Sequence, residues 1–248
     1  MDITLQAPPV SAPTAVEVRG VTRRFGAVTA LQELSLRAVE HEVVCVVGPS
    51  GCGKSTLLEL ICGLQTPDAG TVRSAPAVYM PQRDLLFPWA TALDNAALPL
   101  RVAGRSRAAA RAQAHPLFAE LGLEGFEGAR PDALSGGMRQ RVAFLRTLLA
   151  GKPVLALDEP FAALDALTRA EVQRWLEQAL ARSPRTVVLV THDVEEAVVL
   201  GDRVVVLSPR PGHVVAELPV ALPRPRRRTD ADVVALRERA LQALGVPA

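Results

Sequence analysis

Cysteine is scarce in this chain, with only Cys45, Cys52 and Cys62 among 248 residues. The three form no Cys-x-x-Cys pair and are odd in number, so the sequence indicates neither a disulfide framework nor a zinc site. We expect all three to be small core or loop residues.

Long hydrophobic runs are also lacking. No window approaches the roughly 18 consecutive apolar residues that span a bilayer, so any membrane role has to come through a partner. The start of the chain has Asp2, no basic residue before Arg19, and no apolar stretch of the signal-peptide type. We therefore expect the protein to stay in a reducing cytoplasm.

The sequence has almost no excess of charge of one sign, with 28 Lys and Arg against 26 Asp and Glu. The net charge is +2, which is too small to favour a nucleic-acid partner, and Lys and Arg are spread along the sequence. The exception is Arg224-Pro-Arg226-Arg227-Arg228. We expect a solvated linker there, with contact to a phospholipid surface or an acidic partner as the alternative.

The hydrophobic pattern predicts an α/β fold. Fully apolar runs at 43–47, 154–157 and 187–190 are typical of strands buried on both faces, and helical segments at 138–150 and 166–182 precede the last two. This alternation is typical of a parallel sheet covered by helices. Two segments near the start, 16–18 and 34–36, alternate like strands with one buried face.

The chain divides into three predicted parts. Residues 1–14, rich in Pro and Ala, are expected to form a flexible tail, and residues 15–222 the folded domain. Inside that domain, about 83–150 is rich in Ala, Arg and Leu, with strong helical propensity over 101–121, and is predicted to be a helical insertion. Residues 223–248 are predicted to be the basic linker and one short amphipathic helix.

A glycine-rich loop follows the first buried run. It reads Gly48-Pro49-Ser50-Gly51-Cys52-Gly53-Lys54-Ser55-Thr56, and a helix is expected over 57–64. Glycines let backbone N–H groups turn inward, and the positive end of the helix faces the same point. Lys54 can reach the β- and γ-phosphates and the Ser55 hydroxyl can bind Mg²⁺. The strand, loop and helix together predict a site for a nucleoside triphosphate.

Two adjacent carboxylates end the second buried run. Asp158 and Glu159 lie where ligands of parallel sheets bind. We expect Asp158 to serve the Mg²⁺ ion and Glu159 to polarise the attacking water.

A second anion-binding helix start is predicted at Ser135-Gly136-Gly137. A phosphate-loop enzyme needs only one anion-binding helix start for its own nucleotide. The second helix start therefore binds something else, or a nucleotide held by another copy of the chain.

Taken in order and spacing, these motifs resemble the ATP-binding subunit of ABC transporters, from about Val16 to Leu222. The resemblance implies a P-loop NTPase (RecA-like) core with a parallel sheet, an N-terminal antiparallel β portion, and a helical subdomain inserted after Gln82. It also implies a head-to-tail homodimer, or paired cassettes, that share two ATP sites.

The resemblance assigns further roles. The phosphates and Mg²⁺ would be held by Lys54, Ser55 and Thr56, with Asp158 and Gln82 assisting the metal. Glu159 would be the general base, and His192 would contact the γ-phosphate. Phe25 would stack on adenine, with a buried core Phe as the alternative. Ser135 and Gly137 would reach the opposing ATP, and Asp165 would lie at the dimer seam.

One position departs from the family. The signature motif usually has Gln where this chain has Met138, although the anion-binding Ser135 and Gly137 remain. We expect activity to survive, and we keep open a subunit that binds ATP but hydrolyses it slowly.

The segments Tyr79–Asn95, Glu159–Arg169 and Ser208–Gly212 resemble those of bacterial importers for nitrate, sulfonate, taurine or thiamine-precursor pyrimidines. The partners implied are transmembrane permease subunits and, indirectly, a solute-binding protein. The resemblance also implies that the protein is located at the cytoplasmic face of the bacterial membrane. The apolar stretch 85–89 either receives a helix of the permease or is buried within the helical subdomain.

Two other functions stay open. One is an exporter or lipid-handling ATPase. The other is a nucleotide-gated clamp on ribosomes or DNA, although such proteins generally carry two cassettes or a long coiled-coil insertion, which this sequence lacks.

Overall fold

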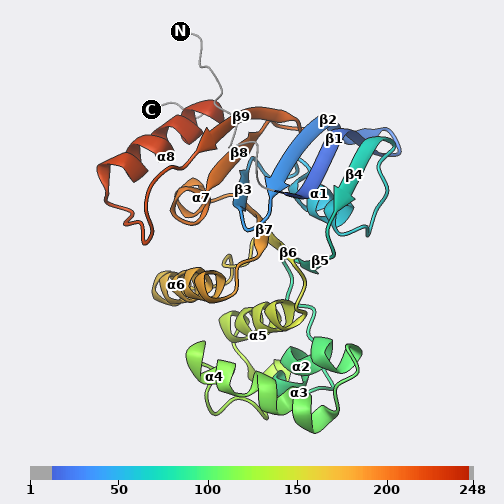
Figure 1. Cartoon of the computed structure of the whole chain (residues 1–248), viewed down its shortest axis with the longest axis vertical. Helices are drawn as coiled ribbons and strands as arrows, with labels where there is room; N and C mark the ends of the chain where they lie inside the picture. Colours follow the sequence, from blue (N-terminus) through green and yellow to red (C-terminus); the bar gives the residue numbers. More distant parts are fainter. Residues whose placement is uncertain (1–12, 246–248) are drawn as a thin grey trace.

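The strands of residues 13–245, the part that the computed structural model describes, form two sheets (Figure 1). The smaller one is antiparallel, in the order β2-β1-β4, with β1 (Thr14–Phe25), β2 (Val28–Val39) and β4 (Ala69–Ser74). The larger one runs β5-β6-β7-β3-β8-β9 and is parallel except for β9. Its strands are β3 (Val43–Val47), β5 (Ala77–Met80), β6 (Val154–Asp158), β7 (Thr186–Thr191), β8 (Arg203–Leu207) and β9 (Val214–Pro219).

The buried strands carry two hydrophobic cores, one on each face of the larger sheet. Successive side chains of a strand point to opposite faces. In β3, Val44 and Val46 pack with α1 and the smaller sheet, whereas Cys45 and Val47 pack with the helices on the other face. The fully apolar runs were therefore read correctly as strands buried on both faces, and the predicted α/β fold with a parallel sheet is confirmed.

The helices surround this sheet. Figure 1 shows α7 and α8 beside the larger sheet, and α2 to α5 grouped at the opposite end of the molecule. Their bounds are α1 (Lys54–Ile61), α2 (Ala92–Val102), α3 (Arg107–Ala114), α4 (Pro116–Glu120), α5 (Gly136–Leu149), α6 (Ala166–Arg182), α7 (Val194–Leu200) and α8 (Ala231–Ala243), with a 3₁₀ turn at Pro131–Ala133. None of the described helices is both long and apolar enough to cross a bilayer.

The expected helical stretch 101–121 is broken in the structure. After α2 the chain turns at Gly104, whose φ is 90°, a conformation that glycine adopts without steric cost. Ser106 then caps α3 by accepting a hydrogen bond from the Ala109 N–H at 3.2 Å. Pro116 begins α4, because proline suits a first helical turn but lacks the N–H of an interior one.

Several predicted bounds shift. The first helix starts at Lys54, not Leu57, and ends at Ile61, because the glycine loop leads directly into it. The predicted helix 138–150 begins two residues earlier, behind Ser135. The predicted tail 1–14 lies outside the described residues apart from its end, where Thr14 already belongs to β1.

The basic run 224–228 is exposed except at Arg226, as expected of a solvated segment, but the expected linker is anchored at Arg224, Arg226 and Arg228. Arg224 pairs with Asp202 at 2.8 Å, and Arg228 pairs with Glu195 at 3.1 Å. Arg226 is buried and donates to backbone carbonyl oxygens around the end of α7. These arginines fasten the segment before α8 to the main sheet domain, because each finds an acceptor or a carboxylate on it.

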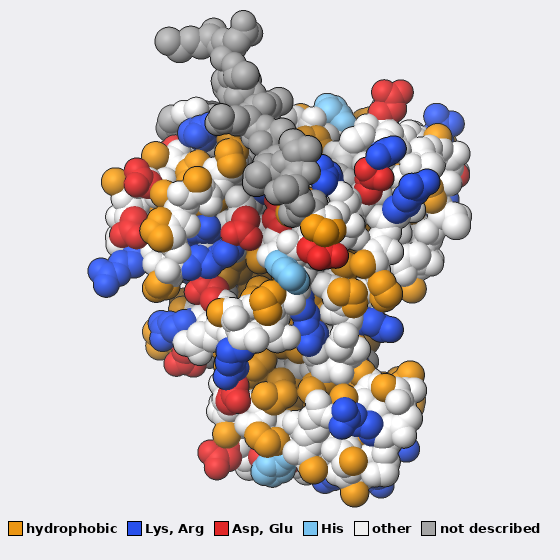
Figure 2. All heavy atoms as spheres, viewed as in Figure 1, with side chains coloured by type: hydrophobic (Ala, Val, Ile, Leu, Met, Phe, Trp, Pro, Cys, Tyr) orange, Lys and Arg blue, Asp and Glu red, His pale blue; other side chains and the backbone are white. Residues whose placement is uncertain are grey.

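The surface carries mixed charge. Figure 2 shows acidic and basic side chains interspersed over the face that it presents, which agrees with the net charge of +2.

Candidate functional site

The sheet order brings the predicted site residues to one edge. Strands β5, β6, β7 and β3 are neighbours, and in parallel strands the carboxyl ends meet at the same edge, where ligands of open α/β sheets bind. A cavity of about 510 Å³ opens there. The predicted residues that line it are Phe25, Ser50, Gly51, Gly53, Lys54, Ser55, Thr56, Gln82, Asp158 and Glu159.

The glycine-rich loop is tightly constrained. A Cβ on Gly48 would lie 2.8 Å from the Cys52 Sγ, and Gly53 has a φ of 101°. Lys54 is buried, and its Nζ donates to the carbonyl oxygens of Gly48 at 2.7 Å and Pro49 at 3.0 Å. The loop therefore wraps around the lysine, which places one positive charge at the base of the cavity.

Glu159 joins two other predicted catalytic residues. Its Oε2 accepts a hydrogen bond from the Gln82 Nε2 at 3.2 Å and lies 3.1 Å from the His192 Nδ1. Three segments, which follow β5, β6 and β7, thus meet at one carboxylate oxygen. These contacts fix the direction of the Glu159 carboxylate.

Asp158 is buried at the end of β6, beside the phosphate loop. Burial raises the pKa of its carboxyl group, while hydrogen bonds from the Ser55 and Tyr79 hydroxyls act in the opposite direction. The Tyr79 hydroxyl donates to the Asp158 Oδ2 at 3.0 Å. This tyrosine was not among the predicted site residues, because β5, the strand that carries it, was not recognised in the sequence.

Phe25 ends β1 at the rim of the cavity. It is 46% exposed, so the alternative of a buried core residue was wrong. The Arg23 guanidinium carbon lies 4.8 Å from the centre of its ring, a distance typical of a cation–π contact.

Some predicted residues lie elsewhere. Ser135 caps α5 by accepting from the Met138 N–H at 3.2 Å, with Gly136 and Gly137 in the first turn. Asp165 caps α6 through the N–H groups of Leu167 and Thr168, and these hydrogen bonds lower the pKa of its carboxyl group. None of these four lines the cavity, and Gly48, Pro49 and Cys52 form the loop without lining it.

Three cavity residues were missed by the sequence analysis, namely Val28, Ala30 and Arg210. The first two belong to β2. Arg210 comes from the loop between β8 and β9, far along the chain. The segment Ser208–Gly212 resembles that of bacterial importers, but nothing in the sequence indicated that it lies close to the phosphate loop.

Comparison with known proteins agrees with this geometry. The family model described as ABC transporter matches residues 31–162. The formylaminopyrimidine import ATP-binding protein of Halalkalibacterium halodurans is 46% identical over 193 residues, which cover 77% of this chain and 78% of that protein. An aliphatic sulfonates import ATP-binding protein of Agrobacterium fabrum is 44% identical over 241 residues, covering 96% and 86%.

Solved structures show the same likeness. A dimeric ATP-binding cassette in a post-hydrolysis state, bound to ADP and Pi, matches with a TM-score of 0.76 and 31% identity, covering 84% of this chain and 99% of that one. The dimeric structure of a bacterial ABC transporter cassette matches with a TM-score of 0.77 and 30% identity, over the same shares. The chain belongs to the ABC transporter family, as an ATP-binding subunit whose ATPase activity is coupled to transport.

Proposed function

We propose that this chain hydrolyses ATP to drive import of a small solute, an aliphatic sulfonate or a formylaminopyrimidine, through a membrane permease. The observation that carries the ATPase assignment is the meeting of Gln82, Glu159 and His192 beside a phosphate loop. The direction and cargo rest on the two import proteins described above, which share 44% and 46% identity with this chain.

Different residues of the cavity bind different parts of the nucleotide. Phe25 is exposed at the rim, where adenine can stack on the ring face opposite Arg23. Lys54 can exchange its carbonyl partners for phosphate oxygens, since ammonium N–H donors favour an anionic acceptor. The backbone N–H groups of Gly53, Ser55 and Thr56 complete the phosphate cradle at the start of α1.

The oxygen donors beside the loop fit Mg²⁺. Ser55, Asp158 and Gln82 line the cavity together, and each has a side-chain oxygen. Hard oxygen ligands are those that Mg²⁺ prefers. Bound there, the ion would neutralise phosphate charge during hydrolysis. Tyr79 positions Asp158 for this role through its hydroxyl.

Glu159 acts as the general base. Its Oε2 is held by Gln82 and His192, which leaves the other carboxylate oxygen able to accept the proton of the attacking water. Because Gln82 precedes the segment 85–89, whose Leu85, Phe87 and Trp89 are exposed while Leu86 is buried, a change at the γ-phosphate can be passed to that surface.

A second copy completes each site. Ser135 and Gly137 form a helix start away from the chain's own cavity, so they are free to meet the nucleotide of an opposing subunit. The dimeric state of the two similar solved cassettes supports this arrangement. ATP binding would then close the dimer and hydrolysis would open it.

The permease contact lies after Gln82, on the cytoplasmic face of the membrane. Leu85, Phe87 and Trp89 are 59%, 38% and 72% exposed, and the rings of Phe87 and Trp89 stack with centroids 5.1 Å apart. Exposed aromatic clusters of this kind mark interaction sites. Of the two readings of the stretch 85–89, we therefore propose contact with a permease helix.

Reconstitution tests the proposal. The chain is purified with the permease that co-purifies with it from membranes, and the complex is placed in vesicles that contain ATP, with the cognate solute-binding protein and labelled solute outside. Inward accumulation of an alkanesulfonate or a formylaminopyrimidine, lost in Glu159→Gln, is the expected result. Outward transport, or failure of the chain to associate with any multi-span protein, would contradict it.

A further inference from the structure

The loop between β8 and β9, residues 208–213, is built against the phosphate loop. The Gly212 N–H donates to the Ala30 carbonyl at 2.9 Å, and the Gln32 N–H donates to the Gly212 carbonyl at 3.0 Å. A Cβ on Gly212 would collide with the carbonyl oxygen of Cys52. The loop is thus held between β2 and the glycine-rich loop, with no room for any side chain at Gly212.

Internal hydrogen bonds give this loop a fixed shape. The Ser208 hydroxyl lies 2.9 Å from the Pro211 carbonyl oxygen and 2.9 Å from the His213 Nδ1. The His213 N–H donates back to the Ser208 Oγ at 3.1 Å. These hydrogen bonds therefore fix the backbone of the loop on both sides of Arg210.

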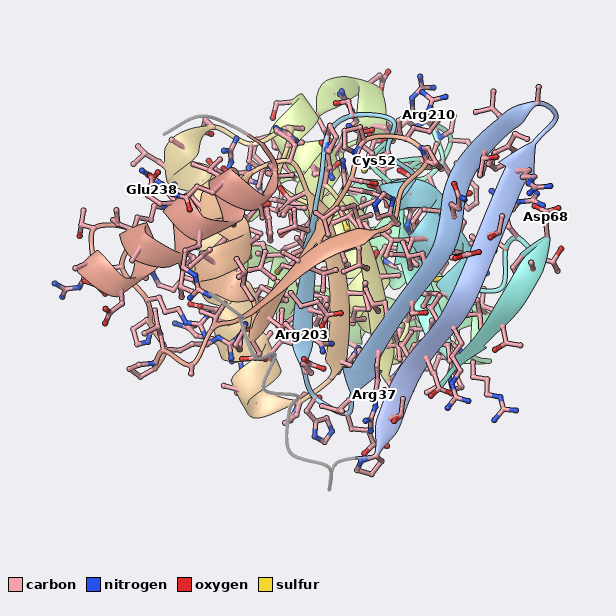
Figure 3. The ribbon with its side chains drawn as sticks, turned by 90° about the horizontal axis from the view of Figure 1, so that it is seen from above. Arg37, Cys52, Asp68, Arg203, Arg210 and Glu238 are labelled. Carbon is pink, nitrogen blue, oxygen red and sulfur yellow. The ribbon has the colours of Figure 1, made fainter. Side chains whose placement is uncertain are left out.

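Arg210 lies on the wall of the nucleotide cavity. One guanidinium nitrogen, Nη2, is 3.2 Å from the point where a Cβ on Gly51 would stand. It shares the cavity with Ser50 and Lys54. Figure 3 shows Arg210 and Cys52 at the same end of the sheet, the end where the glycine-rich loop lies.

The guanidinium of Arg210 has no ion pair or hydrogen bond with any residue in 13–245. The two carboxylates of the same cavity already have partners, Tyr79 for Asp158 and Gln82 with His192 for Glu159. An exposed guanidinium has five N–H donors in a planar fork, a geometry that matches phosphate oxygens. An anion entering the cavity is thus the guest that this side chain can bind.

We propose that Arg210 binds the terminal phosphates of ATP, as a second cation in addition to Lys54, supplied from the β8–β9 loop. The inference rests on the proposed ATP site and extends it by one residue. Gly51 has a φ of 76°, and a Cβ there would also lie 3.2 Å from the Arg210 Nη2, so the guanidinium packs closely against the loop.

Nucleotide affinity tests this directly. Binding of ATP, ADP and AMP to the full chain is measured by calorimetry for the wild type, Arg210→Ala and Arg210→Lys. Arg105→Ala removes an equal charge from an exposed site in the α2–α3 loop and serves as the matched control. All variants are first compared by thermal unfolding.

Arg210→Ala is expected to raise the Kd for ATP about 5–20-fold, because a charge-assisted hydrogen bond to phosphate is lost. The effect is expected to shrink from ATP to AMP. Arg210→Lys should restore part of the affinity, since it keeps the charge without the fork. Arg105→Ala should match the wild type.

Two results would overturn the inference. One is unchanged ATP affinity in Arg210→Ala, including the case in which only ATP-dependent dimerisation is lost, which would assign the guanidinium to an opposing subunit. The other is an equal loss for all three nucleotides, which would indicate a general distortion of the cavity. Lys54→Ala separates this failure from that of the proposed function: if that variant binds ATP normally, the cavity is not the ATP site and both proposals fall.

Discussion

Glu159 holds a backbone conformation that residues other than glycine seldom adopt. Its φ is 46°, and its N–H donates to the Val190 carbonyl at 2.9 Å. Strain of this kind persists where surrounding contacts enforce it, and it concentrates at functional sites. Here it turns the carboxylate out of the strand direction, toward Gln82 and His192.

Glu159→Gln should leave ATP affinity unchanged and lower turnover about 10²- to 10⁴-fold, the usual contribution of a general base. The amide keeps the size and polarity of the side chain but cannot accept the proton of water. Calorimetry with ATP and a phosphate-release assay measure the two effects. Lys54→Ala is the comparison variant, because it should lose affinity itself. Unchanged turnover in Glu159→Gln would remove the role assigned to this residue.

Tyr79 is a second single residue whose contact can be tested, because its hydroxyl group orients Asp158. In Tyr79→Phe, Asp158 loses one hydrogen bond that orients its carboxylate, and the Mg²⁺ concentration for half-maximal ATPase activity should rise about tenfold, as for other partners of metal ligands. Nucleotide affinity measured in EDTA should stay unchanged, because the lost hydroxyl does not line the nucleotide cavity. An unaltered Mg²⁺ requirement would show that Asp158 is positioned without it.

At the scale of elements, α8 depends on one buried arginine. The Arg226 guanidinium donates to five backbone carbonyl groups, those of Val198, Val199, Gly201, Val220 and Leu222. It thereby joins the end of α7 to the segment that leads from β9 into α8.

Arg226→Ala should lower the free energy of unfolding by about 3 kcal/mol, because several buried carbonyl groups lose their donor at once. Denaturant unfolding measures this. Arg227→Ala is the matched control, since its side chain is exposed one position away. Equal stability of the two variants would show that the Arg226 hydrogen bonds are not needed to hold α8 in place.

The elements that could be predicted from the sequence are those marked by a pattern within the element itself. The buried strands have a continuous apolar run, and α6 was predicted with the bounds 166–182 that the structure shows, because Asp165 caps its start and no proline interrupts it. β4 and β5 were not recognised, since β4 is mostly exposed and β5 is four residues long.

The remaining errors concern contacts between distant residues. The basic run 224–228 looks like a solvated segment until the carbonyl groups of α7 and the carboxylate of Asp202 are placed beside it. Arg210 and Tyr79 reach the site only through the sheet order. Such pairings depend on tertiary packing, which the composition of a short segment does not encode.

At the scale of the whole molecule, the helices α2 to α5 lie apart from the nucleotide cavity but are tied to it. Arg146 of α5 donates to the carbonyl oxygens of Asp84 at 2.6 Å and Leu85 at 2.9 Å. The segment after Gln82 is therefore fastened to the helix that Ser135 caps. A movement of the segment after Gln82 should therefore be accompanied by a movement of α5.

Trp89→Ala should weaken co-purification with the permease while the ATPase rate of the isolated chain stays within about twofold of the wild type, because the ring lies outside the cavity and is exposed. Affinity purification from membranes, with quantitation of the permease, measures the first effect. Leu64→Ala is the control, an exposed apolar residue that follows α1. Equal recovery of the permease with both variants would assign the contact to another surface.

The central claim is that two copies of this chain share their ATP sites. Size-exclusion chromatography with light scattering on Glu159→Gln, with and without Mg-ATP, tests it most directly, because this variant binds ATP without consuming it. We predict a monomer without nucleotide and a dimer with Mg-ATP, and the dimer should be lost when Ser135→Ala is added to the same chain. A monomer in both conditions would contradict the claim that Ser135 and Gly137, with Met138 in the signature motif, close on the ATP of a second subunit.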